Sequence, residues 1–416
     1  MNNLRRFWFS LALTAGLLAA RAVSADPLSD PTGAPLPPTW HLHFPLLNIL
    51  LAPLFDLWDG VSMLSLRRMT GFVWGVVGIF VLWRAARAVR TLAEPSPLGR
   101  STLREVGVAV AFLVALAAFL LVGAVWHRPM AALAGTAPDE IVADFHSHTN
   151  ASHDVHGTLM NGFDVAAGRR WHARAGFDAF FITDHNTVRG LRATTFAPEA
   201  PGPIVCPGIE VSAWRSHIVL LGDTTDVDRR LYNGSLDKLL DLLEQSKQRY
   251  GALTIASIPE YDDNLWTLRD SLVAAGIDGF EIVNAAPKAS EFTTAHRDTI
   301  IALARRSHLA LLGVSDSHGW GATSMTWNVL PLPDWRAEPA RTCGRILDRL
   351  RTAGPDAVRI VERHRLRSDA WWPRWLTAVG VVWETWRGLG WAQAAGWLGW
   401  IWVVSAIAAL RGRRGG

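Results

Sequence analysis

The feature that most constrains the fold is a run of 21 residues, 106–126, that contains no charged side chain. At about 1.5 Å per residue, a helix of this length crosses the roughly 30 Å hydrocarbon core of a bilayer. Two further uncharged stretches, 69–83 and 388–410, lie between arginines whose side chains can extend to the interface. The sequence therefore predicts three membrane-spanning helices, two before and one after a large central region.

The placement of arginines predicts how these helices are oriented. Arg5 and Arg6 precede an apolar run that ends in small residues, so residues 1–25 are interpreted as a signal peptide or an N-terminal anchor. Arginines cluster between the first two spans and after the third. Because short arginine-rich loops stay in the cytoplasm, we expect residues 69–126 to form two spans joined by a basic cytoplasmic loop. Residues 26–68 would then be an extracytoplasmic or interfacial segment, and residues 127–387 would lie on the extracytoplasmic (periplasmic) side of the membrane.

Composition supports a multi-pass membrane protein and argues against nucleic-acid binding. Charged residues make up 19% of the chain, and there are 21 Trp but only 3 Tyr. Tryptophan favours the membrane interface, so the Trp-rich residues 371–387 are predicted to be an interfacial segment before the third span. The net charge of +4 arises in the flanks, because residues 138–330 carry 16 Lys and Arg against 24 Asp and Glu. The lipid bilayer is an expected partner, no nucleic acid is expected, and the sequence indicates no particular protein partner.

Between residues 137 and 365 short β-rich runs alternate with helix-like stretches. The predicted strands are 141–145, 178–182, 204–211, 217–221, 253–256, 279–283 and 310–314, and the predicted helices are 161–175, 235–250, 264–275 and 291–307. Such alternation favours a parallel sheet. About seven strands in this length favour an α/β fold, a distorted (β/α) barrel, flanked by the N- and C-terminal transmembrane helices.

Potential metal ligands follow the ends of four predicted strands. They are His146, His148 and Asp154 after the first strand, Asp184 and His185 after the second, Glu210 within the third, and Asp316 and His318 after the last. In a β/α barrel the carboxyl ends of the strands meet at one mouth, and residues i and i+2 of an extended chain point to the same side. Any single residue could instead be a cap or a surface charge, but four such clusters favour a shared metal site.

These motifs resemble those of the PHP (polymerase and histidinol phosphatase) family of metal-dependent phosphoesterases. The matching segments are Asp-Phe-His-Ser-His-Thr-Asn-Ala-Ser-His-Asp at 144–154, Ile-Thr-Asp-His-Asn at 182–186, and the segments 208–210, 280–284 and 313–318. The resemblance covers under half of the chain and leaves the membrane segments unexplained. It implies a distorted, seven-stranded β/α barrel with up to three metal ions at its mouth.

The resemblance also implies a role for each ligand. His146 and His148 would bind a first metal with Glu210 and Asp316, and Glu210 would bridge to a second metal with His217. Asp154, His185 and His318 would hold a third, and Asp184 would orient an imidazole. The family commonly has a His before the Pro that follows the fifth strand, whereas Ile258 stands there in this chain. The second metal would then be absent, or Glu260 or Glu281 would replace the missing ligand.

Three further side chains are candidates for catalysis. His153, next to Asp154, is a candidate acid for the leaving group, the alternative being an exposed loop histidine. Arg189 and Arg215 are candidate bidentate ligands for a phosphate, the alternative being solvated surface arginines. The donor set of imidazoles and carboxylates without thiolate suits Zn, Mn or Fe, so two or three divalent ions are expected as cofactors.

The sequence therefore predicts a membrane-tethered, divalent-metal-dependent phosphoesterase that hydrolyses a phosphomonoester or phosphodiester by metal-activated hydroxide. Its phosphorylated substrate could be a glycan, a lipid head group, a nucleotide or a protein phosphoresidue. One alternative is a non-catalytic metal- or ligand-binding module of a membrane complex. Another is hydrolysis of an amide or cyclic ester on the same barrel. The two cysteines, Cys206 and Cys343, are interpreted as unrelated buried thiols, or as a disulfide if this region is exported.

Overall fold

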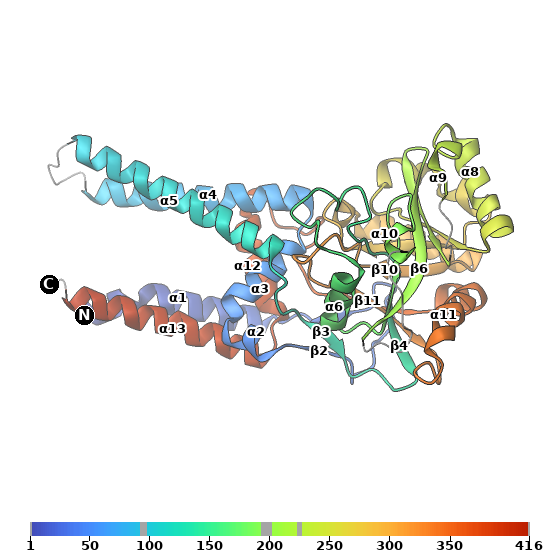
Figure 1. Cartoon of the computed structure of the whole chain (residues 1–416). Coiled ribbons are helices and arrows are strands. Elements are labelled where there is room, and N and C mark those ends of the chain that lie inside the picture. Colours follow the sequence, from blue (N-terminus) through green and yellow to red (C-terminus); the bar gives the residue numbers. More distant parts are fainter. Residues whose placement is uncertain (1, 92–97, 193–201, 223–226, 415–416) are drawn as a thin grey trace.

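The computed structural model describes residues 2–91, 98–192, 202–222 and 227–414, and it shows a globular α/β part from which four long helices project on the same side (Figure 1). These helices, here called the stalk, are α1 Asn2–Ala22, α4 Leu66–Thr91, α5 Leu98–Val125 and α13 Trp391–Arg414. Helix α1 packs along α13, and α4 lies beside α5, where the rings of Phe80 and Phe112 stack with centroids 4.0 Å apart. The N-terminal part of α1 and the C-terminal part of α13 lie side by side at the far end of the stalk, where the rings of Phe7 and Trp402 are in contact (Figure 1).

Three stalk helices are long and apolar enough to cross a membrane, by length and composition. They are Leu66–Val89 in α4, Thr102–Val125 in α5 and Trp391–Arg411 in α13, with mean hydropathies of 1.6, 2.9 and 1.5. They coincide with the three predicted spans, although α4 is longer than predicted because its helix continues through the flanking arginines. Residues 92–97 of the predicted basic loop lie outside the described residues.

The first 22 residues contribute a shorter apolar helix stretch, Phe7–Ala22. Leu17 and Ala20 of this stretch are fully buried in a cluster with Trp386 and Trp397. The guanidinium of Arg21 also donates to the carbonyl of Arg387 at 2.9 Å. Whether residues 1–25 are a signal peptide or an N-terminal anchor stays a prediction.

Short elements join the stalk to the globular part. Residues 26–68 contain β1 Leu28–Ser29, β2 His41–His43, α2 Leu46–Leu50 and α3 Ala52–Ser62. The predicted Trp-rich interfacial segment forms η5 Arg374–Leu376 and helix α12 Thr377–Gly388, which packs against α1, α3 and α4. Trp371 and Trp375 are exposed, whereas Trp386 is buried.

The globular part is built on a ten-stranded sheet in the order β1-β12-β11-β4-β5-β6-β7-β8-β9-β10. All seven predicted strands are present, as β4 Glu140–Asp144, β5 Ala179–Ile182, β6 Ile204–Ala213, β7 Ser216–Leu221, β8 Leu253–Ala256, β9 Gly279–Asn284 and β10 Ala310–Val314. The expected count of about seven is too low, because β11 Thr326–Pro331, β12 Arg359–Arg363 and β1 extend the sheet beyond β4. A separate two-stranded sheet pairs β2 with β3 Ala132–Ala134.

The sheet is mixed, so the expectation of a parallel sheet is wrong for part of it. Strands β4, β5 and β6 are parallel, as are β8, β9 and β10, but β7 is antiparallel to both of its neighbours. The reversed direction of β7 is caused by a hairpin between β6 and β7. In this hairpin Ala213 pairs with Ser216 across the two-residue turn of Trp214 and Arg215. Arg215 adopts a left-handed backbone with φ of 60°.

The sheet curls into a half-barrel that brings the carboxyl ends of β4 and β10 together. The amide of Asp316 donates to the carbonyl of His146 at 2.9 Å, and the amide of His148 donates to the carbonyl of Ser317 at 3.0 Å. Farther along, the amide of Gly313 donates to the side-chain oxygen of Asn328 at 2.9 Å. The α/β class is therefore confirmed, and two predicted ligand motifs lie side by side.

Helices cover the sheet and bury its apolar faces. The four predicted helices are present as α6 Val165–Ala175, α8 Leu236–Gln245 with the π-helical η2 Ser246–Tyr250, α9 Asp262–Ala274 and α10 Thr294–Ser307. Helix α11 Pro339–Ala353 and the short α7 Arg189–Arg192, η1 Arg229–Leu231, η3 Ala289–Glu291 and η4 Gly354–Asp356 complete the described elements. The largest core cluster joins β6–β9 to α8–α10, for example through Ile209, Leu242 and Phe280. Burial of these side chains holds the strand ends, and so the ligand motifs, in place.

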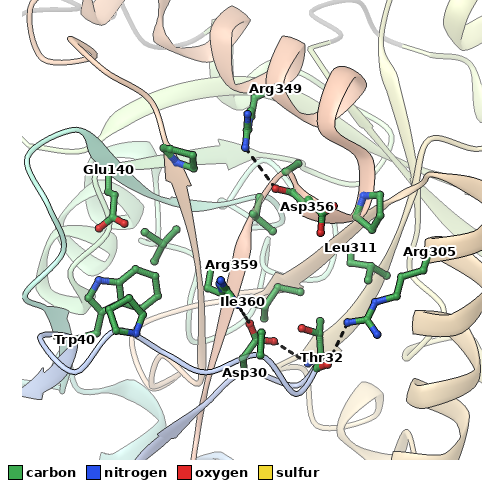
Figure 2. A pocket seen from close by; sticks show the side chains of 17 residues that line it. Asp30, Thr32, Trp40, Glu140, Arg305, Leu311, Arg349, Asp356, Arg359 and Ile360 are labelled. Atoms are coloured by element: carbon green, nitrogen blue, oxygen red, sulfur yellow. Dashed lines mark hydrogen bonds and ion pairs between the residues drawn. The ribbon is translucent and has the colours of Figure 1, made fainter.

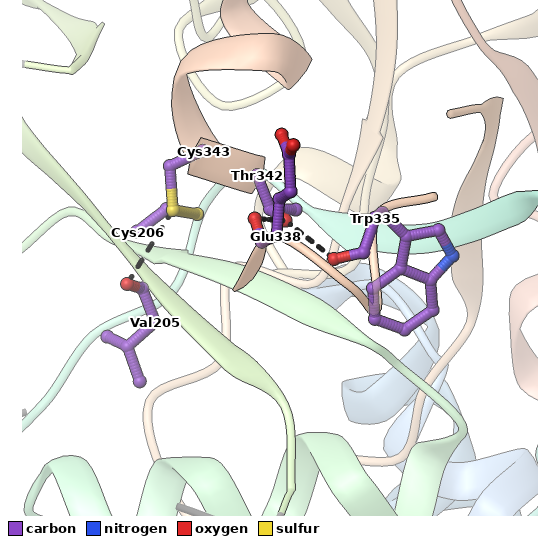
Figure 3. Close-up of a disulfide and its surroundings, with 6 residues drawn as sticks. All are labelled: Val205, Cys206, Trp335, Glu338, Thr342 and Cys343. Carbon is purple, nitrogen blue, oxygen red and sulfur yellow. Dashed lines mark hydrogen bonds between the residues drawn. A yellow bond between two sulfur atoms is a disulfide. The ribbon is translucent and has the colours of Figure 1, made fainter. Parts of the chain in front are cut away.

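Cys206 of β6 and Cys343 of α11 form a disulfide (Figure 3). Their Cα atoms are 5.5 Å apart although 137 positions separate them in the chain. The interpretation of two unrelated thiols is therefore wrong, and the alternative of a disulfide is confirmed. Disulfides persist in oxidising compartments, so this bond agrees with the expected export of the globular part.

Candidate metal centre

The eight predicted metal ligands gather at the carboxyl ends of the curled strands. Three groups of donor atoms lie within 4.8 Å of one another: His148, Asp154, His185 and His318; His146, His148 and Asp316; and His185, Glu210 and His217. His148 and His185 each belong to two groups, so the three groups form one continuous cluster. It is called the metal cluster below.

The backbone at two strand ends departs from extended geometry to aim these side chains. Asp316, just after β10, has φ of 44°, and Asn186, just after His185, has φ of 55°. Non-glycine residues rarely adopt this left-handed region, and where they do the strain is often found at functional sites. The side chain of Asn186 is held by Ser212, whose amide donates to the Asn186 side-chain oxygen at 2.9 Å.

Glu210 lies at the centre of the metal cluster. Its Oε2 atom is 3.0 Å from Nε2 of His146, 3.2 Å from Nε2 of His148 and 3.1 Å from Nδ1 of His185. Its Oε1 atom is 2.7 Å from Nδ1 of His217. One carboxylate therefore faces four imidazoles, and the bridging role that the family resemblance implies for it stays a prediction.

Two other carboxylates complete the metal cluster. Oδ1 of Asp316 lies 3.1 Å from Nε2 of His148 and 3.5 Å from Nε2 of His146. Oδ2 of Asp154 lies 3.1 Å from Nε2 of His185 and 2.7 Å from Nε2 of His318. The cluster is thus buried around His146 and becomes half-exposed around Asp154 and His318.

These separations fit shared divalent cations. Nitrogen and oxygen ligands bind such ions at about 2.0–2.2 Å, so donors on neighbouring corners of a tetrahedron or octahedron are roughly 3.0–3.5 Å apart. Nε2 of His146 and Nε2 of His148 face each other at 3.1 Å. Oδ1 of Asp316 and Nδ1 of His185 are buried and have no hydrogen-bond partner in the described structure. A cation would satisfy these atoms, so the donor set fits divalent metal ions.

The electrostatics of the metal cluster couple its buried carboxylates to its imidazoles. Burial would raise the pKa of the Glu210 carboxyl, but the imidazoles of His185, His217 and His146 together lower it well below its ordinary value. Burial would lower the pKa of His148, but the carboxylates of Asp316 and Glu210, both close to its Nε2 atom, raise it to about 10. The buried carboxylates are therefore held as anions, and each demands positive charge close by.

Glu281 of β9 orients His146 from behind. Nδ1 of His146 donates to Oε1 of Glu281 at 2.7 Å, which leaves Nε2 aimed into the metal cluster. Oε2 of Glu281 accepts from the Ser257 hydroxyl at 2.7 Å and from the side-chain amide of Asn284 at 2.9 Å. The sequence suggested Glu281 only as a replacement ligand, but a carboxylate in this position fixes the tautomer of a metal-binding histidine.

We expect Glu281→Ala to weaken metal binding by about 10- to 100-fold, because His146 would lose the group that orients it. Glu281→Gln keeps an acceptor in place and should recover most of that loss. Titration of zinc into metal-depleted protein, followed by calorimetry, measures both affinities. Unchanged zinc affinity in a folded Glu281→Ala protein would contradict this positioning role.

Asp184 has a different partner from the imidazole that was expected. Its two carboxylate oxygens accept from the amide of Thr149 at 2.6 Å and from the Thr149 hydroxyl at 2.7 Å. Asp184 therefore holds the loop that follows His148. The other nitrogen of His148 instead faces the Ser152 hydroxyl at 3.3 Å.

The three remaining candidates lie at the surface. His153 is exposed, and its ring centroid is 4.8 Å from that of His185, so it borders the metal cluster. Arg189 is exposed on α7 and donates to the Thr187 hydroxyl at 3.2 Å. Arg215 is exposed at the β6–β7 turn. The catalytic roles of His153, Arg189 and Arg215 stay predictions.

Sequence reasoning missed two residues beside the metal cluster. The hydroxyl of Tyr261 lies 2.9 Å from Nε2 of His217, and the ammonium of Lys288 lies 4.3 Å from the centroid of the Tyr261 ring. Tyr261 follows Pro259 and Glu260, in the stretch where Ile258 replaces the histidine of the family motif. This departure from the motif was the signal that could have drawn attention to Tyr261. Lys288 had no signal in the sequence.

A polar cavity of about 350 Å³ lies at the opposite ends of the strands (Figure 2). Glu140 at the start of β4 and residues 357–360 at the start of β12 line it. Its charges are partnered locally, since Arg359 pairs with Asp30 at 3.6 Å and Arg305 donates to the carbonyl of Thr32 at 3.2 Å. None of the eight predicted ligands lines this cavity.

Solved structures resemble this chain at low similarity. A two-domain protein from Bacteroides vulgatus that contains a predicted PHP-like metal-dependent phosphoesterase is 17% identical, with a TM-score of 0.35, over 51% of this chain and 63% of that chain. An amidohydrolase from Chromobacterium violaceum is 18% identical, with a TM-score of 0.29, over 48% and 96%. A lesion-specific endonuclease from Pyrococcus furiosus is 15% identical, with a TM-score of 0.33, over 46% and 52%. No family model matches the chain, and no curated protein matches it significantly.

Proposed function

We propose that this chain is a membrane-anchored phosphoesterase of the PHP type that depends on divalent metal ions. The observation that supports it most is the convergence of eight imidazole and carboxylate side chains at separations suited to shared cations. Donors of nitrogen and carboxylate oxygen without thiolate suit Zn, Mn or Fe, and three overlapping donor groups suit two or three ions. The motif order in the sequence supports the same assignment.

Each residue of the metal cluster would have a distinct role in phosphoester hydrolysis. Bound divalent cations would supply Lewis acidity, which makes water nucleophilic at neutral pH and neutralises charge on the phosphoryl oxygens. Glu210 would be the carboxylate ligand at the centre of the donor set that holds the cations. Glu281 would keep His146 aimed at them, and His153, at the exposed edge, would deliver a proton to the departing oxygen.

We assign Glu260 as the replacement for the histidine that the family commonly has. Ile258 is fully buried in the core and so is not a ligand, whereas Oε2 of Glu260 lies 3.8 Å from Nδ1 of His217. Burial, with the negative charges of Asp316 and Glu210, raises the pKa of Glu260 to about 7. A cation next to His217 would relieve this repulsion and restore a complete donor set.

Turnover of the purified full chain tests the proposed function. Metal-depleted protein in detergent is supplied with Mn or Zn and offered an aryl phosphomonoester, an aryl phosphodiester, an amide and a cyclic ester. Metal-dependent cleavage of the phosphoesters supports the proposal. Tight metal binding without any hydrolysis would favour the non-catalytic module, and cleavage of only the amide or cyclic ester would favour the third reaction class.

We further propose that the globular part faces the extracytoplasmic side. The disulfide between Cys206 and Cys343 and the arginines at the far end of the stalk support this orientation. Protein extracted from cells with its free thiols blocked should therefore carry two cysteines that react only after reduction. Cys343→Ser should destabilise the globular part by about 2–4 kcal/mol, since the bond closes a long loop. Free, alkylatable cysteines in the native protein would overturn the orientation.

A further inference from the structure

One cavity connects the metal cluster to the membrane-spanning helices. Its volume is about 640 Å³, a size typical of ligand pockets. The globular part contributes Asp316 and His318 of the metal cluster, the loop residues Gly319, Gly321, Ala322 and Thr323, residues 285–288 and Met160. Helices α3, α4 and α5 contribute Trp58, Val61, Ser62, Leu66, Met69, Leu120, Gly123 and Ala124. We call it the stalk cavity. It is distinct from the polar cavity of Figure 2, which lies at the opposite strand ends.

The two ends of the stalk cavity differ in chemistry. One end has the carboxylate of Asp316 and the imidazole of His318, with the exposed ammonium of Lys288 at its rim. The other end has apolar side chains from the stalk, among them Leu66 and Leu120. A nucleotide or sugar phosphate would place polar groups against this apolar wall and leave their hydrogen bonds unmade.

The apolar wall is closely packed. Nε1 of Trp58 donates to the carbonyl of Phe119 at 2.8 Å, which fixes the indole against α5. A Cβ atom added at Gly123 would lie 2.6 Å from the Trp58 ring, and one added at Gly321 would lie 2.1 Å from the carbonyl of Ala124. The two glycines therefore allow α5, α3 and the loop after His318 to approach closely enough to form the cavity.

The apolar end lies where the spans join the globular part. Leu66 is the first residue of the span in α4, and Gly123 and Ala124 are among the last of the span in α5. Only 6% of the most apolar 18-residue window of each span is buried inside the protein, so in a bilayer both helices would face lipid. A hydrocarbon chain in the bilayer could thus enter the cavity while the head group to which it is attached reaches the metal cluster.

We propose that the substrate is a membrane lipid phosphoester, with its phosphate at the metal cluster and the start of its hydrocarbon chain in the stalk cavity. This inference rests on the proposed function and narrows the substrate class. In the reaction the oxygen of water bonds to phosphorus and the phosphoester P–O bond breaks. The departing oxygen takes a proton, so a lipid phosphomonoester yields a lipid alcohol and phosphate. Lys288, which lines the cavity, would offer a positive charge to the lipid phosphate.

A comparison of lipid and soluble substrates tests this inference. Full-length protein in mixed micelles with Mn is offered dioleoyl phosphatidic acid, dioleoyl phosphatidylglycerol, glycerol 3-phosphate and an aryl phosphate. We expect kcat/KM for at least one of the two lipids to exceed that for glycerol 3-phosphate by at least about 100-fold, because several methylenes leave water. The two lipids distinguish a phosphomonoesterase from a phosphodiesterase.

A matched pair of variants tests the stalk cavity itself. Leu66→Trp fills the apolar end at a side chain that is 53% exposed, and Leu82→Trp adds the same ring at a 70% exposed position of α4 that does not line the cavity. Leu66→Trp should lower the ratio of lipid to aryl phosphate kcat/KM by about tenfold, as expected when about two methylenes are displaced. It should also weaken binding of phosphatidic acid to metal-depleted protein. Leu82→Trp should change neither quantity.

The outcomes separate this inference from the proposed function. Hydrolysis of aryl phosphate and glycerol 3-phosphate without preference for either lipid would overturn the lipid assignment and leave the phosphoesterase intact. An unchanged ratio and unchanged lipid binding in folded Leu66→Trp would also overturn it. Absence of metal-dependent hydrolysis of every phosphoester would overturn the proposed function, whereas the lipid-binding measurement on metal-depleted protein would still report on the cavity.

Discussion

Replacing Glu210 with glutamine is expected to lower metal-dependent phosphoester hydrolysis by about a thousandfold or more. Glu210 faces four imidazoles, and its side chain is 1% exposed, so no water can take over its charge. Glutamine has nearly the same shape but presents one neutral oxygen where two anionic ones bridge neighbouring donor groups. Metal ions contribute several kcal/mol to such reactions, and each 1.36 kcal/mol is a factor of ten in rate.

Metal content measured with activity makes this prediction specific. The Glu210→Gln protein should hold at least one ion fewer per chain than the unaltered protein by elemental analysis, with an unchanged circular dichroism spectrum. Glu244→Gln is the matched control, because Glu244 is exposed on α8 and bonds only to Gln248 in the described structure, at 2.9 Å. A folded Glu210→Gln protein with full metal content and full activity would show that the cluster is not the metal site.

The strands that carry the site were predictable because each is a short apolar run with a polar motif at its end. The strands that were missed lack this pattern. β12 begins and ends with an arginine, in the sequence Arg-Ile-Val-Glu-Arg, yet its residues from Ile360 to Arg363 are buried. The hairpin between β6 and β7 was not predicted, because Trp214 and Arg215 form its turn without the glycine or asparagine that such turns favour.

Within the site, residues next to one another in the chain were predictable and their distant partners were not. The His-x-His pair is recognisable in the sequence because its two residues are close together in the chain. Glu281 lies 135 positions from His146, which it orients. Pairing of Cys206 with Cys343 likewise depended on where α11 packs against the sheet. The stalk cavity combines loops of the α/β part with α3, α4 and α5, so no single segment of sequence encodes it.

Asp59 of α3 is the residue whose loss should most destabilise the junction between the stalk and the globular part. Its Oδ1 accepts from Arg128 at 3.0 Å and its Oδ2 from Arg363 of β12 at 2.8 Å. Arg128 is fully buried and also donates to the carbonyl of Gly321 at 2.7 Å, in the loop after His318. Burial would raise the pKa of Asp59, but the two guanidiniums lower it, so the carboxylate is ionised.

Asp59→Ala should therefore lower stability by about 3–5 kcal/mol, because two buried arginines would lose their counter-charge. Thermal unfolding in detergent should show a Tm lower by roughly 10 °C. Asp270→Ala is the control, because it removes only an exposed carboxylate 3.8 Å from Arg269 and should change the Tm little. The loop that carries His318 should also lose its anchor to Arg128. At temperatures where the variant is still folded, the rate of hydrolysis should therefore be lower, while the metal that His146 would bind is retained. An unchanged Tm in Asp59→Ala would mean that the junction does not depend on the ion pairs of Asp59, and these pairs would then not be the polar support of the stalk cavity.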